Sequence, residues 1–132
     1  MTGLDTNILT RYLAQDDPIQ SLRATRLIER ELSARNPGLI SVVVLLELLW
    51  VLESVYALGE AARISVVERL LAAKELRLEA PQLVRKALLI KSTASAGLAD
   101  ILIGLIYQVQ GAHETATFDK RASKLPGWRL LK

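Results

Sequence analysis

The chain has 132 residues, of which 51% are hydrophobic and 23% charged, proportions that favour one folded domain over residues 1–132 and exclude a disordered chain. Cysteine is absent, which excludes a disulfide framework, a thiolate zinc site and a cysteine nucleophile, and which fits a cytoplasmic protein. The net charge of +3 permits a nucleic-acid partner without requiring one.

Short strands and helices alternate along the chain. The predicted elements are a strand at 2–5, a helix at 6–13, a helix from 18 that breaks at 36–38, a strand at 39–40, helices at 42–56 and 60–73, a strand at 76–79, helices at 81–91 and 98–110, and strands at 115–118 and 128–131. Helix starts are indicated by cap residues: Thr6, Asp17 before Pro18, and Ser41. Gly111 is the expected stop of the helix at 98–110.

This alternation indicates an α/β fold with a central parallel sheet of four or five short strands, flanked by helices. In open parallel sheets, ligands bind beyond the carboxyl ends of the strands. Two apolar runs, 39–52 and 98–109, are interrupted by Glu47 and Asp100. Both runs are shorter than a membrane span of about 20 residues, so no membrane partner and no targeting segment are expected.

Glu47 and Asp100 are carboxylates inside apolar helices. The helix around Glu47 is apolar on every side and is therefore expected to be buried. A buried carboxylate costs several kcal/mol unless it is paired or bound to a metal. Glu47 is thus either a metal ligand or an edge glutamate paired with an arginine. Asp100 lies in the first turn of its helix, where an acid could also serve only to complement the helix dipole.

Asp5 and Asp119 each follow a predicted strand, although either could be a simple turn or cap residue. Together with Glu47 and Asp100 they could converge on one edge of the sheet. Clustered carboxylates repel each other and need cations to coexist. Hard oxygen ligands select Mg²⁺ or Mn²⁺ over zinc, and such a centre activates water for phosphoryl transfer.

Other residue types narrow the chemistry. His113 is the only histidine, which excludes a paired-histidine nuclease, and its predicted loop makes it an exposed bystander. No glycine-rich phosphate loop is present, so ATP chemistry is not expected. Trp50 is expected in the core or in a dimer contact, and Trp128 in a core strand.

Basic residues flank Asp119 and could steer a nucleic-acid backbone, or could simply be solubilising surface charges. The candidates are Lys120, Arg121 and Lys124. Arginines at positions 23, 26 and 30 form a second basic face on the predicted helix from residue 18.

Four segments, in order and at family spacing along the whole chain, resemble the motifs of PIN domains and especially of VapC toxins. They are Met1–Leu9 with Asp5-Thr6-Asn7, Ser41–Leu48 with Glu47, Ala99–Ile103 with Asp100, and Thr115–Lys120 with Asp119. One departure stands out: some family members carry another acid just before the third-motif aspartate, where this chain has Ala96-Gly97-Leu98-Ala99. That difference implies a weaker second metal site.

The resemblance implies a three-layer α/β/α fold and a Mg²⁺- or Mn²⁺-dependent endoribonuclease that hydrolyses RNA phosphodiester bonds. It implies that the metal-binding, catalytic acids are Asp5, Glu47, Asp100 and Asp119. Thr6 or Asn7 would order the first acid and nearby water, and Thr117 would support the site through its hydroxyl. It also implies a homodimer and a small cognate antitoxin as partner.

The mechanistic hypothesis is that Asp5, Asp100 and Glu47 hold one metal ion, while Asp119 serves a second ion or orients the attacking water. Two other classes of function stay open. The chain could be a catalytically silent PIN-like module that binds RNA or protein, or a metal nuclease directed at DNA, because the architecture alone does not distinguish these substrates.

Overall fold

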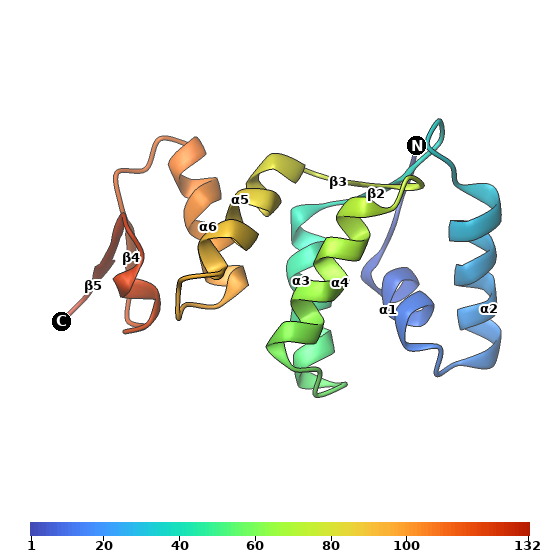
Figure 1. The fold of residues 1–132 in the computed structure, drawn as a ribbon, viewed down its shortest axis with the longest axis horizontal. Coiled ribbons are helices and arrows are strands. Elements are labelled where there is room, and N and C mark those ends of the chain that lie inside the picture. The colour runs from blue at the N-terminus through green and yellow to red at the C-terminus, as the bar shows by residue number, and fades with distance from the viewer. The chain divides into compact units, whose positions relative to one another are not determined.

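Six α-helices and five short strands alternate along the computed structural model, which describes residues 1–132 (Figure 1). The contacts between Cα atoms divide the chain into two units, Met1–Glu79 and Ala80–Lys132. Every strand pair is parallel. The predicted α/β fold class is therefore confirmed.

The first unit, drawn in blue to green in Figure 1, contains three strands and four α-helices. Its elements are β1 (Thr2–Gly3), α1 (Thr6–Ala14), α2 (Pro18–Arg26) with the π-helical turn η1 (Leu27–Glu31), β2 (Gly38–Ile40), α3 (Val42–Ser54), α4 (Glu60–Ala72) and β3 (Leu76–Leu78). The sheet order is β1-β2-β3, with Gly38 of β2 opposite both Thr2 and Leu76. Gly38 is needed there, because a Cβ atom would lie 2.7 Å from the side chains of Leu32 and Leu4.

Side-chain caps explain where these helices begin. The Asp17 carboxylate accepts hydrogen bonds from the backbone N–H groups of the first turn of α2, and Ser41 accepts one from Val44 at 3.1 Å, as predicted. The predicted cap of α1 was wrong by one residue. Asp5 has the extended backbone of an N-cap, and its Oδ1 accepts from Thr6 N at 2.8 Å. The Asp5 carboxylate therefore caps the helix, and Thr6, the predicted cap, is the first helical residue.

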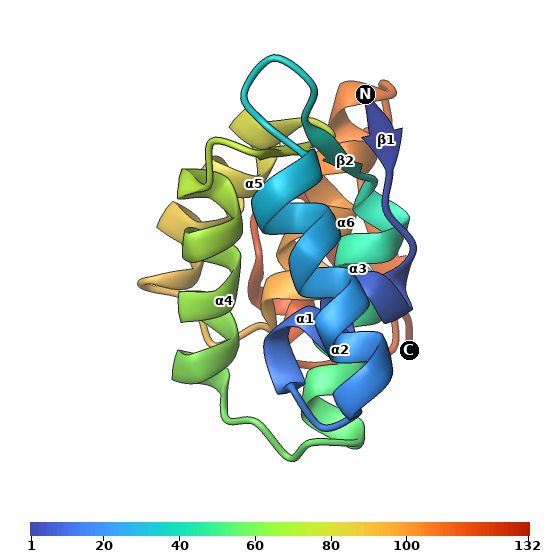
Figure 2. The same cartoon turned by 90° about the vertical axis from the view of Figure 1, so that its right-hand side faces the viewer.

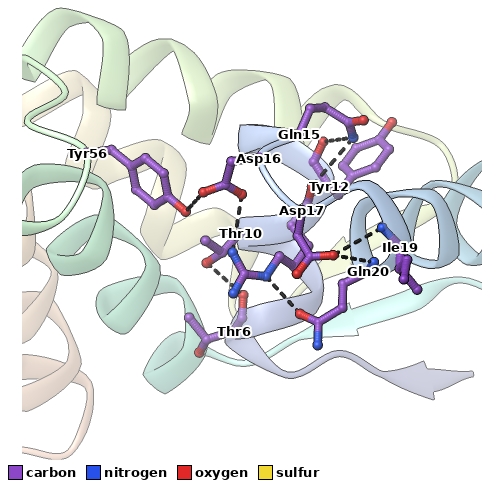
Figure 3. Close-up of polar contacts among 10 residues, drawn as sticks. Thr6, Thr10, Tyr12, Gln15, Asp16, Asp17, Ile19, Gln20 and Tyr56 are labelled. Carbon is purple, nitrogen blue, oxygen red and sulfur yellow. Dashed lines mark hydrogen bonds and ion pairs between the residues drawn. The ribbon is translucent and has the colours of Figure 1, made fainter.

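Helix α1 packs against α2 and α3, as the two views in Figures 1 and 2 both show. The largest fully buried side chains of this unit are Leu9, Ile28, Ile40, Leu45, Leu48 and Val67. A polar cluster ties the ends of three helices together (Figure 3). Arg11 forms an ion pair with Asp16 at 3.2 Å, and the Tyr56 hydroxyl donates to Asp16 at 2.7 Å.

The second unit contains two helices and two strands. They are α5 (Pro81–Lys91), α6 (Leu98–Val109), β4 (Thr115–Thr117), the 3₁₀ turn η2 (Ala122–Lys124) and β5 (Trp128–Leu130). Helices α5 and α6 pack together around Val84, Ala87 and Leu102. The expected stop at Gly111 is confirmed: its φ of 93° lies in the left-handed region, which glycine adopts without strain.

The arrangement of strands differs from the expectation of one central sheet. All five predicted strands form, but hydrogen bonds join them as a three-stranded sheet in the first unit and a β4-β5 pair in the second. The alternation of residue types specifies that a segment is extended, whereas pairing depends on contacts distant in sequence. None of the helices combines the length and the apolar character that a membrane crossing requires.

Candidate active site

Asp5 is positioned by the junction of β1 and α1. Leu4 before it is buried and donates its N–H to Leu39 O at 2.9 Å, which extends the pairing with β2 up to the acid. The Asp5 side chain is exposed. One carboxylate oxygen accepts from Thr6 N, and the other makes no hydrogen bond. Asp5 therefore has a fixed orientation and one oxygen available for a ligand.

Thr6 and Asn7, the residues predicted to support Asp5, have different environments. Thr6 is buried, and its Oγ1 has no hydrogen-bond partner, a state that typically costs about 1–3 kcal/mol. Its carbonyl oxygen accepts from the Thr10 hydroxyl at 3.0 Å (Figure 3). Asn7 is exposed at a hollow of about 410 Å³ that is also lined by Arg11 and Arg23. An unpaired hydroxyl beside the first acid fits a role in ordering that acid and water.

Glu47 does not lie where its apolar surroundings predicted. It is exposed and makes neither a hydrogen bond nor an ion pair, so its expected burial and the alternative of an arginine pair are both wrong, whereas its role as a metal ligand stays a prediction. Only one face of α3 is buried, and Glu47 shares the opposite face with Val43 and Trp50. Trp50 is 64% exposed and is not a core residue, contrary to one of its two expected roles.

Sequence reasoning overlooked Glu79. This acid directly follows β3, and its Oε1 accepts from Val42 N, at the N-terminus of α3, at 2.8 Å. The signal that could have found it is the same as for Asp5: an acid directly after a strand with buried residues. Glu79 holds the start of α3, the helix that carries Glu47.

Asp100 lies near the negative charge of Asp119 within the second unit. Asp100 is half-buried at the start of α6 and makes no hydrogen bond. Burial raises the pKa of the Asp100 carboxyl above its usual range, and the negative charge of Asp119 raises that pKa further. These are the causes expected when two carboxylates share one site.

The orientation of Asp119 is set by its own turn. Its Oδ1 accepts from the backbone N–H groups of Arg121 at 2.8 Å and Ala122 at 3.1 Å. The Thr117 hydroxyl accepts from Asp119 N at 2.9 Å. The expected turn role of Asp119 is thus present, and it leaves the second carboxylate oxygen without a hydrogen bond.

The donor set fits a hard divalent cation, although no group of three or more acidic or histidine side chains is close enough together to hold one. Asp100 is affected by the charge of Asp119 in the second unit, while Asp5 and Glu47 belong to the first unit. Each of the four carboxylates has at least one oxygen free of hydrogen bonds. Such oxygens are the ligands that Mg²⁺ and Mn²⁺ prefer, and a cation would relieve the repulsion in the second unit.

The predicted basic residues are all exposed, but they do not share one environment. Arg121 and Lys124 line a hollow of about 460 Å³, and Lys120 lies outside it. His113 is exposed, as predicted. Trp128 packs its indole over Gly104 of α6 and is partly buried.

Comparison with known protein families gives a match to this chain. Residues 4–127 match the PIN domain family, a stretch that includes both units and all four acids. No curated protein matches the chain. PIN domains are generally nucleases that use divalent metal ions, and PIN nucleases bind RNA. Because the match covers nearly the whole chain, this protein belongs to the PIN domain family.

Proposed function

We propose that this protein is a Mg²⁺- or Mn²⁺-dependent endoribonuclease that hydrolyses RNA phosphodiester bonds. The observation that carries the proposal is the pair formed by Asp100 and Asp119 in a chain of the PIN family. A half-buried carboxylate at Asp100, beside the negative charge of the exposed Asp119, destabilises the metal-free protein. The pair is explained if a cation binds there during function.

Each acid has a distinct task in this proposal. Asp5, Glu47 and Asp100 would hold the divalent cation, and Asp119 would orient the attacking water. A bound divalent cation lowers the pKa of water and stabilises negative charge on the phosphate. The N–H groups of Arg121 and Ala122 hold one oxygen of the Asp119 carboxylate, and the Thr117 hydroxyl holds its backbone N–H, so that the other oxygen can accept a proton from water. Thr6 and Asn7 order Asp5 and its water.

The two units work as a single PIN domain, residues 1–132, in this proposal. The family match extends without interruption across the boundary at Glu79 and Ala80. Metal-dependent cleavage would need acids from both units, because each unit contributes only two of the four. The expected outcome is that neither pair supports cleavage without the other.

We place the protein among VapC-type toxins, acting in the cytoplasm and neutralised by a small antitoxin. The four motifs in order support this finer assignment. A homodimer is supported by α3, whose exposed face carries the large apolar side chains of Val43 and Trp50. Exposed apolar surface of this kind is typical of an interaction face.

The alternative is a catalytically silent PIN-like module that binds RNA or protein. All four family acids are present in this chain, which argues against this alternative. The two functions differ in turnover, so one assay separates them.

The test is cleavage of labelled total RNA by purified protein in Mg²⁺, Mn²⁺ or EDTA. Asp5→Asn is compared with Glu68→Gln, which removes one negative charge from an exposed acid of α4 that has no partner. Discrete products that need metal, persist in Glu68→Gln and vanish in Asp5→Asn would establish the ribonuclease. No cleavage by folded wild-type protein that still binds RNA would establish the silent module, and full activity of Asp5→Asn would refute the assignment of that acid.

A further inference from the structure

The second unit contains a hollow of about 460 Å³ that the metal-dependent chemistry does not use. The α5–α6 loop and the segment after Asp119 form its walls. Its polar lining comes from Arg121, Lys124, Thr93 and Ser95, and no acidic side chain lines it. We call it the basic hollow. Its volume lies within the range of about 300–1,000 Å³ that holds small ligands.

Both cations of the basic hollow are free to bind an anion. Arg121 and Lys124 are exposed, and neither side chain makes a hydrogen bond or an ion pair. Other arginines of the chain do have partners: Arg129 pairs with Glu114 at 2.8 Å, and Arg11 with Asp16. Two unpaired cations beside an uncharged cavity form a binding site for phosphate oxygens.

The remaining lining suits a ribose and a base. Ile90 and Pro126 supply apolar surface, and the Ser95 hydroxyl has no hydrogen-bond partner. The loop is held in shape, because Lys91 Nζ donates to Ala94 O at 2.8 Å. Proteins recognise unstacked nucleotides with this combination of apolar contact for the base, polar contact for the 2′-hydroxyl and positive charge for the phosphate.

Both walls of the basic hollow lead directly to the acid pair. The loop wall continues through Gly97, where a Cβ atom would lie 3.8 Å from Asp100 Oδ2. The other wall begins at Arg121, whose N–H donates to the Asp119 carboxylate at 2.8 Å. A strand of RNA bound at Asp100 and Asp119 would therefore bring an adjacent nucleotide to the basic hollow.

We propose that the basic hollow holds one unstacked nucleotide of single-stranded RNA, next to the bond that is cleaved. This inference rests on the proposed ribonuclease function and adds a positioning subsite to it. Arg121 and Lys124 bind the phosphate of that nucleotide, and Lys120 does not take part. A paired base cannot enter the hollow, so duplex RNA binds more weakly than a single strand.

The test measures binding in EDTA, where no cleavage occurs, using the full-length wild-type chain and fluorescence anisotropy. The probes are a labelled single-stranded uridine oligonucleotide of about ten residues and an RNA duplex of the same length. The variants are the double substitution Arg121→Ala with Lys124→Ala, and Ser95→Trp, which fills the hollow without changing charge. Arg85→Ala is the matched control, because Arg85 is an exposed cation of α5 outside the hollow. Circular dichroism verifies that each variant is folded.

We expect the double variant to bind the single strand about tenfold more weakly. Its plot of log K against log salt should be shallower by about 0.7, since the contact with one phosphate of a single strand contributes about that much. Ser95→Trp should lose affinity several-fold with an unchanged salt slope, and Arg85→Ala should match wild type. The proposal is overturned if the double variant binds like Arg85→Ala, if Ser95→Trp binds like wild type, or if the duplex binds as tightly as the single strand.

Cleavage by the same proteins separates this inference from the proposed function. Metal-dependent cleavage by wild type, together with unchanged binding by the double variant, overturns the subsite while the ribonuclease stands. No cleavage by wild type, together with the expected loss of binding, overturns the ribonuclease while the nucleotide site stands. If the enzyme is active, the double variant should raise KM more than it lowers kcat.

Discussion

The two units hold their acids in different electrostatic settings. In the first unit, Asp5 caps a helix and Glu47 is exposed on α3. In the second unit, Asp100 is half-buried near the negative charge of Asp119. Burial raises the pKa of the Asp100 carboxyl most, and the charge of Asp119 raises it further. The positions of Asp5 and Glu47 are ordinary for a helix cap and for an exposed helix face. The acids of the second unit lower the stability of the metal-free protein, and a cation offsets that cost.

The largest expected effect tests whether both units serve one reaction. Asp5→Asn and Asp100→Asn should each lower kcat for RNA cleavage by at least about 100-fold, as does the loss of one electrostatic stabiliser in other enzymes. The kcat of the double variant should be no lower than that of the less active single variant, because the effects of residues that act as a unit are not additive. Single-turnover rates measure this.

Glu68→Gln again serves as the control, and its rate should equal that of wild type. If only one of the two aspartates mattered, or if their losses multiplied, the two units would not share the chemistry.

The second largest effect concerns packing in the second unit. A Cβ atom at Gly104 would lie 2.5 Å from Trp128 Nε1, whereas one at Gly3 would meet nothing within 4 Å. Gly104→Val should lower the free energy of unfolding by about 1–3 kcal/mol, the usual range for overpacking. Gly3→Val is the matched change in the first unit and should be nearly neutral. Urea denaturation decides, and equal effects at both positions would contradict the close packing of the indole.

These contrasts also show which parts of the fold a sequence can predict. Local signals were sufficient for the helices, since caps such as Asp17 and Ser41 act on the N–H groups beside them. They were insufficient for the sheet, because strands of two or three residues pair through contacts far apart in the chain. The α1 cap lies at Asp5 rather than at Thr6, because the Asp5 carboxylate accepts from Thr6 N and Thr6 is the first residue of the helix.

The candidate site was predictable in residue type more than in environment. Asp5 and Asp119 lie just after strands, as predicted. Their catalytic roles stay predictions. Glu47 was placed in the interior because its whole helix is apolar, but a helix is buried only where another element covers it. The influence of Asp119 on Asp100 depends on their distance in space, which no local pattern contains.

A smaller effect is expected from the support of Asp119. Thr117→Val removes the hydroxyl that accepts from Asp119 N, a hydrogen bond worth about 1 kcal/mol. We therefore expect cleavage to slow by about fivefold, the rate equivalent of that energy. Thr117→Ser keeps the acceptor and should restore most of the rate. If serine were as slow as valine, the hydroxyl would not be the group that positions Asp119.

The smallest effect isolates the electrostatic cost in the second unit. The folded-state pKa of Asp100 lies above its ordinary value, so the folded protein binds this proton more tightly than the unfolded chain does. The proton's contribution to stability is present below the ordinary aspartate pKa and is lost as pH rises through the raised folded pKa. Asp100→Asn has no such loss, so its advantage should appear only on the neutral side of that window.

The advantage of Asp100→Asn should be small, since solvent screens a half-exposed carboxylate. Urea unfolding of the metal-free chain at acidic and neutral pH measures it, with Glu68→Gln as a variant whose difference from wild type should not change with pH. Added Mg²⁺ should stabilise wild type more than Asp100→Asn, because a ligand that binds only the folded state raises its stability. A pH-independent difference would locate the effect in packing at α6, and an equal response to Mg²⁺ would separate Asp100 from metal binding.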